Sequence, residues 1–201
     1  MWVIKLGGSL LGTPELNTWL GMLVHQSNGR VVIVPGGGPF ADAVRAAQCS
    51  AGFDDAAAHH MALLAMEQFG LVMKSLHPAL VTAASELEIA ERSWQHRAIV
   101  WQPSQMVLSD ETIARSWDVT SDSLAAWLAE KIGAERLVLV KQADVAENSL
   151  AAHRLVAEGV LDAAFADFAA GLSCPVHIVG KSEHAAFAAA LTGGPLPALA
   201  F

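Results

Sequence analysis

The chain contains 201 residues, of which 53% are hydrophobic and 16% are charged, and it carries a formal net charge of −8 at pH 7. An excess of acidic groups opposes nonspecific attraction to polynucleotides, which argues against a nucleic-acid partner. Polar residues interrupt every long apolar stretch well short of the ~18 residues that a membrane-spanning helix needs, so we expect no membrane segment.

The same quantities set expectations for the organisation of the chain. Its length suits a single α/β domain over residues 1–201 with a substantial core. A strand pattern begins at Trp2 with no basic and apolar leader before it, which predicts a cytoplasmic protein. Two distant cysteines, Cys49 and Cys174, indicate neither a disulfide framework nor a zinc site. The apolar excess, much of it alanine, suggests a subunit interface, so we expect a homo-oligomer.

Short apolar runs alternate with helical patterns along the chain. Runs rich in Val and Ile, continuous enough for strands covered on both faces, occupy residues 2–6, 30–34, 98–101, 136–140 and 175–179. Apolar residues at helical spacing occupy 14–26, 39–47, 54–71, 121–132, 161–170 and 183–191. Residues 102–117 read as a connection with short helical turns, and 142–154 as a surface excursion. This alternation predicts an α/β fold with a parallel sheet.

Two glycine-rich turns follow the first two strand-like runs, and each leads into a segment with helical character. Their sequences are KLGGS at 5–9 and PGGGP at 35–39. Glycine lets the backbone approach an anion closely, and the first N–H groups of a helix have no partner within it. Because ligands of parallel α/β sheets bind beyond the carboxyl ends of the strands, both turns should converge there. They predict a phosphate site.

Other phosphate motifs fit less well. The segment GGGPFA at 36–41 satisfies a loose dinucleotide fingerprint, Gly-x-Gly-x-x-Ala. That fingerprint needs an acidic residue at the end of a second strand about 20 residues later, whereas Asp54 and Asp55 open a helical pattern. The chain has no Gly-x-x-x-x-Gly-Lys-Ser/Thr run, which excludes a P-loop. A nicotinamide-dependent enzyme is therefore kept only as an alternative.

A third polar segment, TSDS at 120–123, opens a strongly apolar helical pattern. Taken alone, this segment favours helix capping: Thr120 or Ser121 could cap the helix, and Asp122 could favour its dipole. A catalytic role for Asp122 needs support from outside the segment.

That support comes from a resemblance to a known family. The segments KLGGS at 5–9, VPGGG at 34–38 and TSDSLA at 120–125 occur in the order and roughly at the spacing of the amino acid kinase family. The chain resembles this family from residue 1 to about 140, which implies a three-layer αβα sandwich of the carbamate kinase-like fold. AHHMA at 58–62, AMEQ at 65–68 and SWDVTSD at 116–122 are similar to the aminomethyl-furanmethanol phosphate kinases of methanofuran synthesis.

The resemblance implies a reaction and a set of site residues. ATP would donate its γ-phosphoryl group to a small acceptor, most sharply a furan-methanol phosphate, and Mg²⁺ would neutralise the nucleotide phosphates without any predicted protein ligand. Lys5 would contact the nucleotide and the transferring phosphoryl group, and Asp122 would position its ammonium. Further nucleotide contacts would be Gly7, Gly8, Ser9, Lys141 and Asp144. Acceptor contacts would be Gly36, Gly37, Gly38, His60, Asp118 and Ser121.

Two segments depart from the family pattern. KQADV at 141–145 replaces a Thr/Ser-Asp-x-x-Gly turn, and LDAAFA at 161–166 lacks the second lysine of a Gly-Gly-Met-x-x-Lys segment. Lys181 and Lys74 are the available substitutes, and Lys181 follows a strand end. Two alternatives therefore stay open: a nucleotide- or anion-binding protein without catalysis, and a kinase for a carboxylate or another phosphate acceptor. Trp117 could form an aromatic wall against a furan-like ring.

Overall fold

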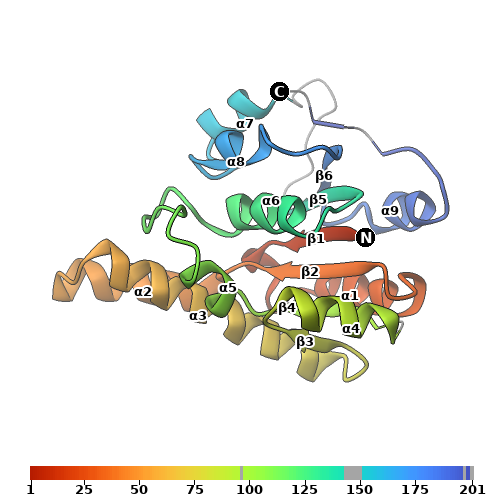
Figure 1. Cartoon of the computed structure of the whole chain (residues 1–201), viewed down its shortest axis with the longest axis horizontal. Coiled ribbons are helices and arrows are strands. Elements are labelled where there is room, and N and C mark those ends of the chain that lie inside the picture. The colour runs from red at the N-terminus through yellow and green to blue at the C-terminus, as the bar shows by residue number, and fades with distance from the viewer. Residues whose placement is uncertain (96, 143–150, 197, 200–201) are drawn as a thin grey trace.

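A single parallel sheet organises the protein. The computed structural model describes residues 1–95, 97–142, 151–196 and 198–199. Within them, six strands follow the order β3-β4-β2-β1-β5-β6, and every pair of neighbours is parallel. Their bounds are Trp2–Leu6 (β1), Val31–Pro35 (β2), Val81–Ala83 (β3), Ile99–Trp101 (β4), Arg136–Lys141 (β5) and Val176–Gly180 (β6). The central position of β1 and β2 places the ends of both strands in the middle of the molecule (Figure 1).

Helices cover both faces of this sheet. Their bounds are Pro14–Gln26 (α1), Gly38–Ala51 (α2), Asp55–Leu76 (α3), Glu86–Trp94 (α4), Ser104–Leu108 (α5), Ser121–Lys131 (α6), Ala152–Ala157 (α7), Phe165–Ala169 (α8) and His184–Leu191 (α9), and a short 3-10 helix, η1, spans Gly8–Leu10. In β1, Val3 belongs to the core cluster that also contains residues of α4, α5, α6, α7 and α8, whereas Ile4 belongs to the cluster that contains residues of α1 and α9, and α3 contributes to both. Successive strand residues point to opposite faces. The predicted three-layer αβα sandwich is confirmed.

Helix α2, which follows the second glycine turn, and the next helix, α3, extend furthest from the sheet. Helix α2 packs along α3, and together they project beyond the strand ends (Figure 1). Both helices run past their predicted ends: α2 continues through residues 48–51, and α3 continues to Leu76 because apolar residues such as the buried Met73 extend its packed face. This projection gives the carboxyl end of the sheet a long side wall.

Some elements were missed at the sequence level. Strand β3 has three residues, too few for a clear periodicity, and α4 is a short helix with mostly polar residues. Helix α8 covers Phe165–Ala169, which is shorter than the predicted 161–170. Helix α7 lies within the predicted surface excursion 142–154, of which residues 143–150 lie outside the described part of the chain.

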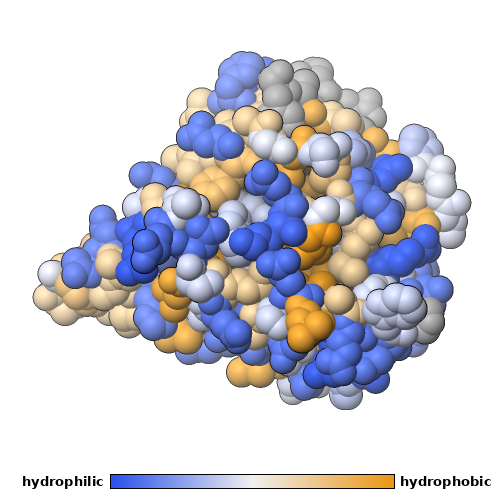
Figure 2. Space-filling model, viewed as in Figure 1, coloured by the Kyte–Doolittle hydropathy of each residue, from blue (hydrophilic) through white to orange (hydrophobic). Residues whose placement is uncertain are grey.

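The surface of the protein does not test the predicted oligomeric state, location or domain count. Among the described residues, no helix is both long and apolar enough to cross a membrane. Apolar side chains are dispersed among polar ones on the face shown in Figure 2. Leu87 and Trp94 of α4 are 79% and 85% exposed, respectively, and Leu71 of α3 is 55% exposed. The homo-oligomer, the cytoplasmic location and the single domain over residues 1–201 therefore stay predictions.

Candidate active site

The two glycine turns lie in direct backbone contact. Strands β1 and β2 are neighbours with Leu6 opposite Pro35, so their chains leave the sheet side by side. A Cβ atom at Gly8 would lie 2.1 Å from the Gly38 nitrogen, and one at Gly36 would lie 2.4 Å from the Gly8 nitrogen. Any larger residue would push the turns apart. Gly38 also has a φ of +53°, which side chains disfavour.

Some N–H groups of the two turns donate to backbone carbonyls, and others have no partner within their own turn. The Gly7 N–H donates to the Val140 carbonyl at 3.3 Å, and the Gly36 N–H donates to the Leu6 carbonyl at 2.9 Å. Gly7 is therefore not free to donate to a phosphate as the family resemblance implied. Gly8 and the exposed Ser9 open η1, and the first N–H groups of such a turn have no partner within it.

A buried charge cluster stands beside these turns. Asp122 lies in the first turn of α6 and is 3% exposed, and Lys5 is the last residue but one of β1 and is 6% exposed. Lys5 Nζ lies 2.9 Å from Asp122 Oδ1, and Lys141 Nζ lies 2.5 Å from Asp122 Oδ2. The two lysines come from neighbouring strands, β1 and β5, which are paired in register. One carboxylate thus holds two ammonium groups.

The mutual effects of these charges appear in their pKa values. Burial alone would raise the pKa of Asp122, but the charges of Lys5 and Lys141 lower it to about 2. Burial would lower the pKa of Lys5, yet Asp122 and Asp162 raise it. For Lys141, burial and the charge of Lys5 outweigh the attraction of Asp122 and lower its pKa to about 8. Lys141 is the group in this cluster that titrates near neutral pH.

Asp162 fixes the start of the helix that carries Asp122. Its carboxylate accepts hydrogen bonds from the backbone N–H groups of Thr120 (3.1 Å), Asp122 (3.0 Å) and Ser123 (2.9 Å), and from the Thr120 hydroxyl. The predicted capping of α6 by Thr120 or Ser121 is therefore replaced by a carboxylate from 40 residues further along the chain. Burial and the nearby Asp122 raise the pKa of Asp162.

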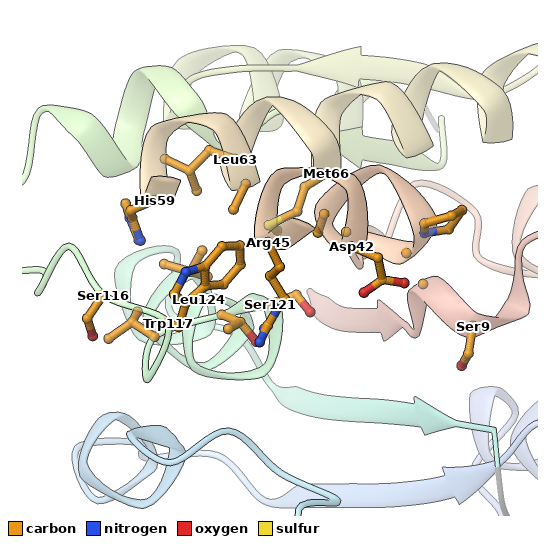
Figure 3. A pocket seen from close by; sticks show the side chains of 18 residues that line it. Ser9, Asp42, Arg45, His59, Leu63, Met66, Ser116, Trp117, Ser121 and Leu124 are labelled. Atoms are coloured by element: carbon orange, nitrogen blue, oxygen red, sulfur yellow. The ribbon is translucent and has the colours of Figure 1, made fainter. Parts of the chain in front are cut away.

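A pocket of about 330 Å³ adjoins the two turns (Figure 3). Its walls come from the turns, from α2, from the first half of α3 and from the loop before α6. The residues that line it are Gly8, Ser9, Gly37, Gly38, Pro39, Ala41, Asp42, Arg45, His59, Ala62, Leu63, Met66, Ser116, Trp117, Val119, Thr120, Ser121 and Leu124. Asp122 directly follows the lining residue Ser121 in the chain, and Lys5 pairs with Asp122 behind that part of the lining.

The pocket contains some of the predicted acceptor residues and omits others. Ser121, Gly37 and Gly38 line it, whereas Gly36 is used in the backbone contact between the turns. His60 is exposed and is not part of the lining, because it lies one position further round α3 than the buried His59. We therefore correct the histidine from His60 to His59.

The remaining predicted residues are spread more widely. Asp118 is exposed; its backbone carbonyl accepts a hydrogen bond from Ala164, so its role here is in the loop before α6. Asp144 lies outside the described residues. Lys181, the substitute favoured by sequence, pairs with Glu15 at 3.3 Å, and Lys74 is exposed on α3. Lys141 supplies the second ammonium instead.

Trp117 forms a fixed wall of the pocket. The Arg45 guanidinium carbon stands 4.0 Å from the centre of its ring, and its Nε1–H donates to Gln48 Oε1 at 2.7 Å. Gln48 in turn donates to Asp55 Oδ1 at 2.8 Å. These contacts attach the loop before α6 to the projecting helices α2 and α3.

Two solved structures share the fold of this chain. A uridylate kinase from Archaeoglobus fulgidus superposes with a TM-score of 0.73 at 19% identity, covering 97% of both chains. A UMP kinase from Ureaplasma parvum superposes with a TM-score of 0.69 at 14% identity, covering 98% of this chain and 96% of the other. At these identities the likeness shows the fold alone, which is the α/β fold of these kinases.

The sequence comparison gives the family. Residues 1–146, which are more than half of the chain, match the amino acid kinase family, and the protein belongs to this family. A (5-(aminomethyl)furan-3-yl)methyl phosphate kinase from Methanocaldococcus jannaschii is 28% identical over 147 residues, which are 72% of this chain and 67% of that relative. The protein is thus an ATP-dependent phosphotransferase for a small molecule. Family membership removes the nicotinamide alternative.

Proposed function

We propose that the protein transfers the γ-phosphoryl group of ATP to the phosphate of a small phosphomonoester and forms a diphosphate. The sharpest version of the acceptor is (5-(aminomethyl)furan-3-yl)methyl phosphate, the compound in the name of the relative from Methanocaldococcus jannaschii. The observation that carries the proposal is the buried Lys5–Asp122–Lys141 cluster, whose Asp122 directly follows Ser121 in the lining of a pocket of about 330 Å³. A volume of this size suits a small acceptor.

The charge balance of the cluster suits phosphoryl transfer. Two ammonium groups and one carboxylate leave a net charge of +1 on Lys5, Asp122 and Lys141. A further carboxylate, that of Asp162, is only partly buried, and its charge faces the N–H and O–H donors at the start of α6. Phosphoryl transfer requires mainly alignment and stabilisation of negative charge, and a positioned donor contributes roughly 3 to 4 kcal/mol in a dry site. Positive charge held by a rigid carboxylate meets that requirement.

Each residue of the cluster then has a definite role. Lys5 lies next to the glycine turns and contacts the transferring phosphoryl group. Lys141 stabilises negative charge from the β5 side, where the family resemblance suggested a nucleotide contact. Asp122 holds both ammonium groups at fixed positions without contacting a phosphate, since like charges repel. Gly8, Gly37 and Gly38 let the phosphates of the donor and the acceptor approach the backbone closely.

Magnesium enters this proposal with the nucleotide. Within the described parts of the chain, no group of three His, Cys, Asp or Glu side chains lies where it could hold a metal ion. The two carboxylates of the charge cluster, Asp122 and Asp162, are both occupied by protein donors. We therefore treat Mg²⁺ as part of the substrate, bound by the phosphates of ATP, and route no step through a protein-bound metal.

The alternative acceptors are separated by a substrate panel. Purified protein is incubated with Mg·ATP and with the furan phosphate, uridine monophosphate or acetylglutamate, and ADP release is measured together with the phosphorylated product. We expect turnover with the furan phosphate and formation of a diphosphate. Turnover with acetylglutamate alone would establish the carboxylate alternative, and ADP binding with no turnover on any acceptor would favour the non-catalytic alternative.

A further inference from the structure

One polar atom in the pocket has no partner. His59 is 4% exposed, lines the pocket, and its Nε2 atom is buried with no hydrogen-bond partner among the described residues. Leaving such an atom unpaired costs ~1–3 kcal/mol, so a native structure needs a reason for it. A ligand that bonds to Nε2 would supply one.

The local structure holds His59 in place. It lies in the first two turns of α3, whose start is capped by Asp54, which accepts from the Ala57 N–H at 2.8 Å. Ala58 and Leu63 beside it are both 1% exposed, so this face of α3 is packed into the protein. The imidazole is therefore a fixed part of the pocket wall (Figure 3).

The chemistry of the ring determines what Nε2 can bind. Burial lowers the pKa of His59 and outweighs a hydrogen bond to the Ser116 backbone that raises it; Arg115 and His60 lower it further. The ring is therefore neutral near pH 7. A hydrogen bond that raises the pKa of a histidine is one in which the histidine donates. Because Nε2 has no partner, the group that donates to the Ser116 backbone is Nδ1–H. Nε2 then carries a lone pair and accepts hydrogen bonds.

The two ends of the pocket differ in character. Ser9, at the glycine turns, and His59 lie at opposite ends in Figure 3, with Met66 between them. The turn end offers backbone N–H groups, which suit a phosphate. The His59 end offers the unpaired Nε2 acceptor, with Leu63 and Ser116 beside it. Between the ends lie Met66 and the Trp117 ring with the Arg45 guanidinium stacked on it at 4.0 Å. An occupant with a phosphate at the turn end and a hydrogen-bond donor at the His59 end fits this distribution.

We propose that His59 Nε2 accepts a hydrogen bond from an amine or hydroxyl group of the acceptor, at the end remote from its phosphate, and so selects acceptors that carry such a donor. This inference rests on the proposed function, because it assigns the phosphate to the turn end. His59 is a specificity-determining residue: it contacts the acceptor away from the reacting atoms, so it changes KM more than kcat.

The first test examines His59 without any substrate. Nitrogen NMR of protein labelled at histidine, assigned with a His59→Gln variant, reports which ring nitrogen carries the proton. We expect a neutral ring with a proton on Nδ1 at pH 7. A proton on Nε2, or a charged ring, would overturn the proposal whether or not the protein phosphorylates a furan.

The second test compares three matched acceptors. They are (5-(aminomethyl)furan-3-yl)methyl phosphate and the analogues in which the aminomethyl group is replaced by hydroxymethyl or methyl. For the wild type we expect the KM of the methyl compound to be about tenfold above that of the better donor compound, with kcat changed about twofold or less. The ranking of the amine and hydroxyl compounds identifies the donor. Equal KM values for all three would overturn the proposal.

Variants assign this discrimination to His59. In His59→Leu we expect the KM values of the three compounds to converge, and in His59→Gln part of the preference returns because the amide oxygen accepts hydrogen bonds. His60→Leu, a change at the exposed neighbour, should keep the wild-type preference. Discrimination that persists in His59→Leu would contradict the proposal. If the wild type phosphorylates none of the compounds, the proposed function fails, and the proton position on His59 still decides this inference.

Discussion

The two sides of the candidate active site are built in different ways. On the side of β1 and β2, short contiguous segments contain the lysine and the glycines, and the register of two neighbouring strands brings the turns into contact. On the side of β5 and α8, the charged groups come from separated positions: Lys141 ends one strand, and Asp162 precedes a short helix. The first side is visible in a sequence motif, whereas the second side exists only after folding.

This difference shows how a missing motif residue can be replaced. The chain has no lysine in the segment at 161–166, yet a second ammonium reaches Asp122 from the end of β5. The same segment contributes a carboxylate that holds the start of α6. Phosphoryl transfer requires positive charge at the reacting centre. It does not matter which segment of the chain supplies that charge.

The largest expected effect tests the motif side. Replacing Lys5 with alanine removes the ammonium at the glycine turns, and we expect kcat to fall by roughly a hundredfold or more with the fold retained. Steady-state ADP release and circular dichroism measure the two quantities. Lys74→Ala, which removes an exposed lysine of α3, serves as the control. Unchanged turnover in Lys5→Ala would remove this residue from the mechanism.

The next prediction concerns the contact between the turns. In Gly8→Ala the new Cβ would meet the Gly38 backbone at 2.1 Å, so the turns must separate. We expect the free energy of unfolding to fall by about 1–3 kcal/mol, with a loss of activity. Gly21→Ala in α1, where the nearest atom would be 3.5 Å away, is the matched control and should not destabilise the protein. Equal stability of both variants would contradict this contact.

The third prediction tests the side of β5 and α8 through the pH dependence of kcat/KM. The pKa of Lys141 is lowered to about 8, so its ammonium is charged below that pH and loses its proton above it. We expect kcat/KM to fall as the pH rises through about 8 and the fall to disappear in Lys141→Arg, because arginine stays charged. Lys181→Ala should keep the wild-type profile. A profile that is the same in Lys141→Arg and the wild type would show that Lys141 does not set it.

The smallest expected effect on activity belongs to Asp162. Its carboxylate receives three backbone N–H groups and one hydroxyl, so Asp162→Asn should weaken the start of α6 and lower the free energy of unfolding by ~1–3 kcal/mol. Because Asp122 keeps both lysines, kcat should fall by less than in Lys5→Ala. Urea unfolding and ADP release measure the two effects. A loss of activity as large as that of Lys5→Ala would place Asp162 in direct contact with the reacting groups.

The sequence predicts the parts of this protein that depend on local pattern. The strand at 136–140 follows from a continuous run of Leu and Val, the helix at 14–26 follows from helical spacing, and the family segments locate Lys5 and Asp122. Strand β3 is too short to show a period, so it exists because β4 pairs with it. The choice of His59 over His60 depends on which face of α3 is buried, and that face is set by packing rather than by spacing.

The central claim is that the buried carboxylate of Asp122 holds two ammonium groups for phosphoryl transfer. The most direct test is single-turnover transfer from radiolabelled Mg·ATP to the furan phosphate by the wild type and by Asp122→Asn, with the fold of both checked by circular dichroism. We predict rapid formation of labelled diphosphate in the wild type and a rate lower by about a hundredfold in the variant. Equal rates in the two proteins would contradict the claim.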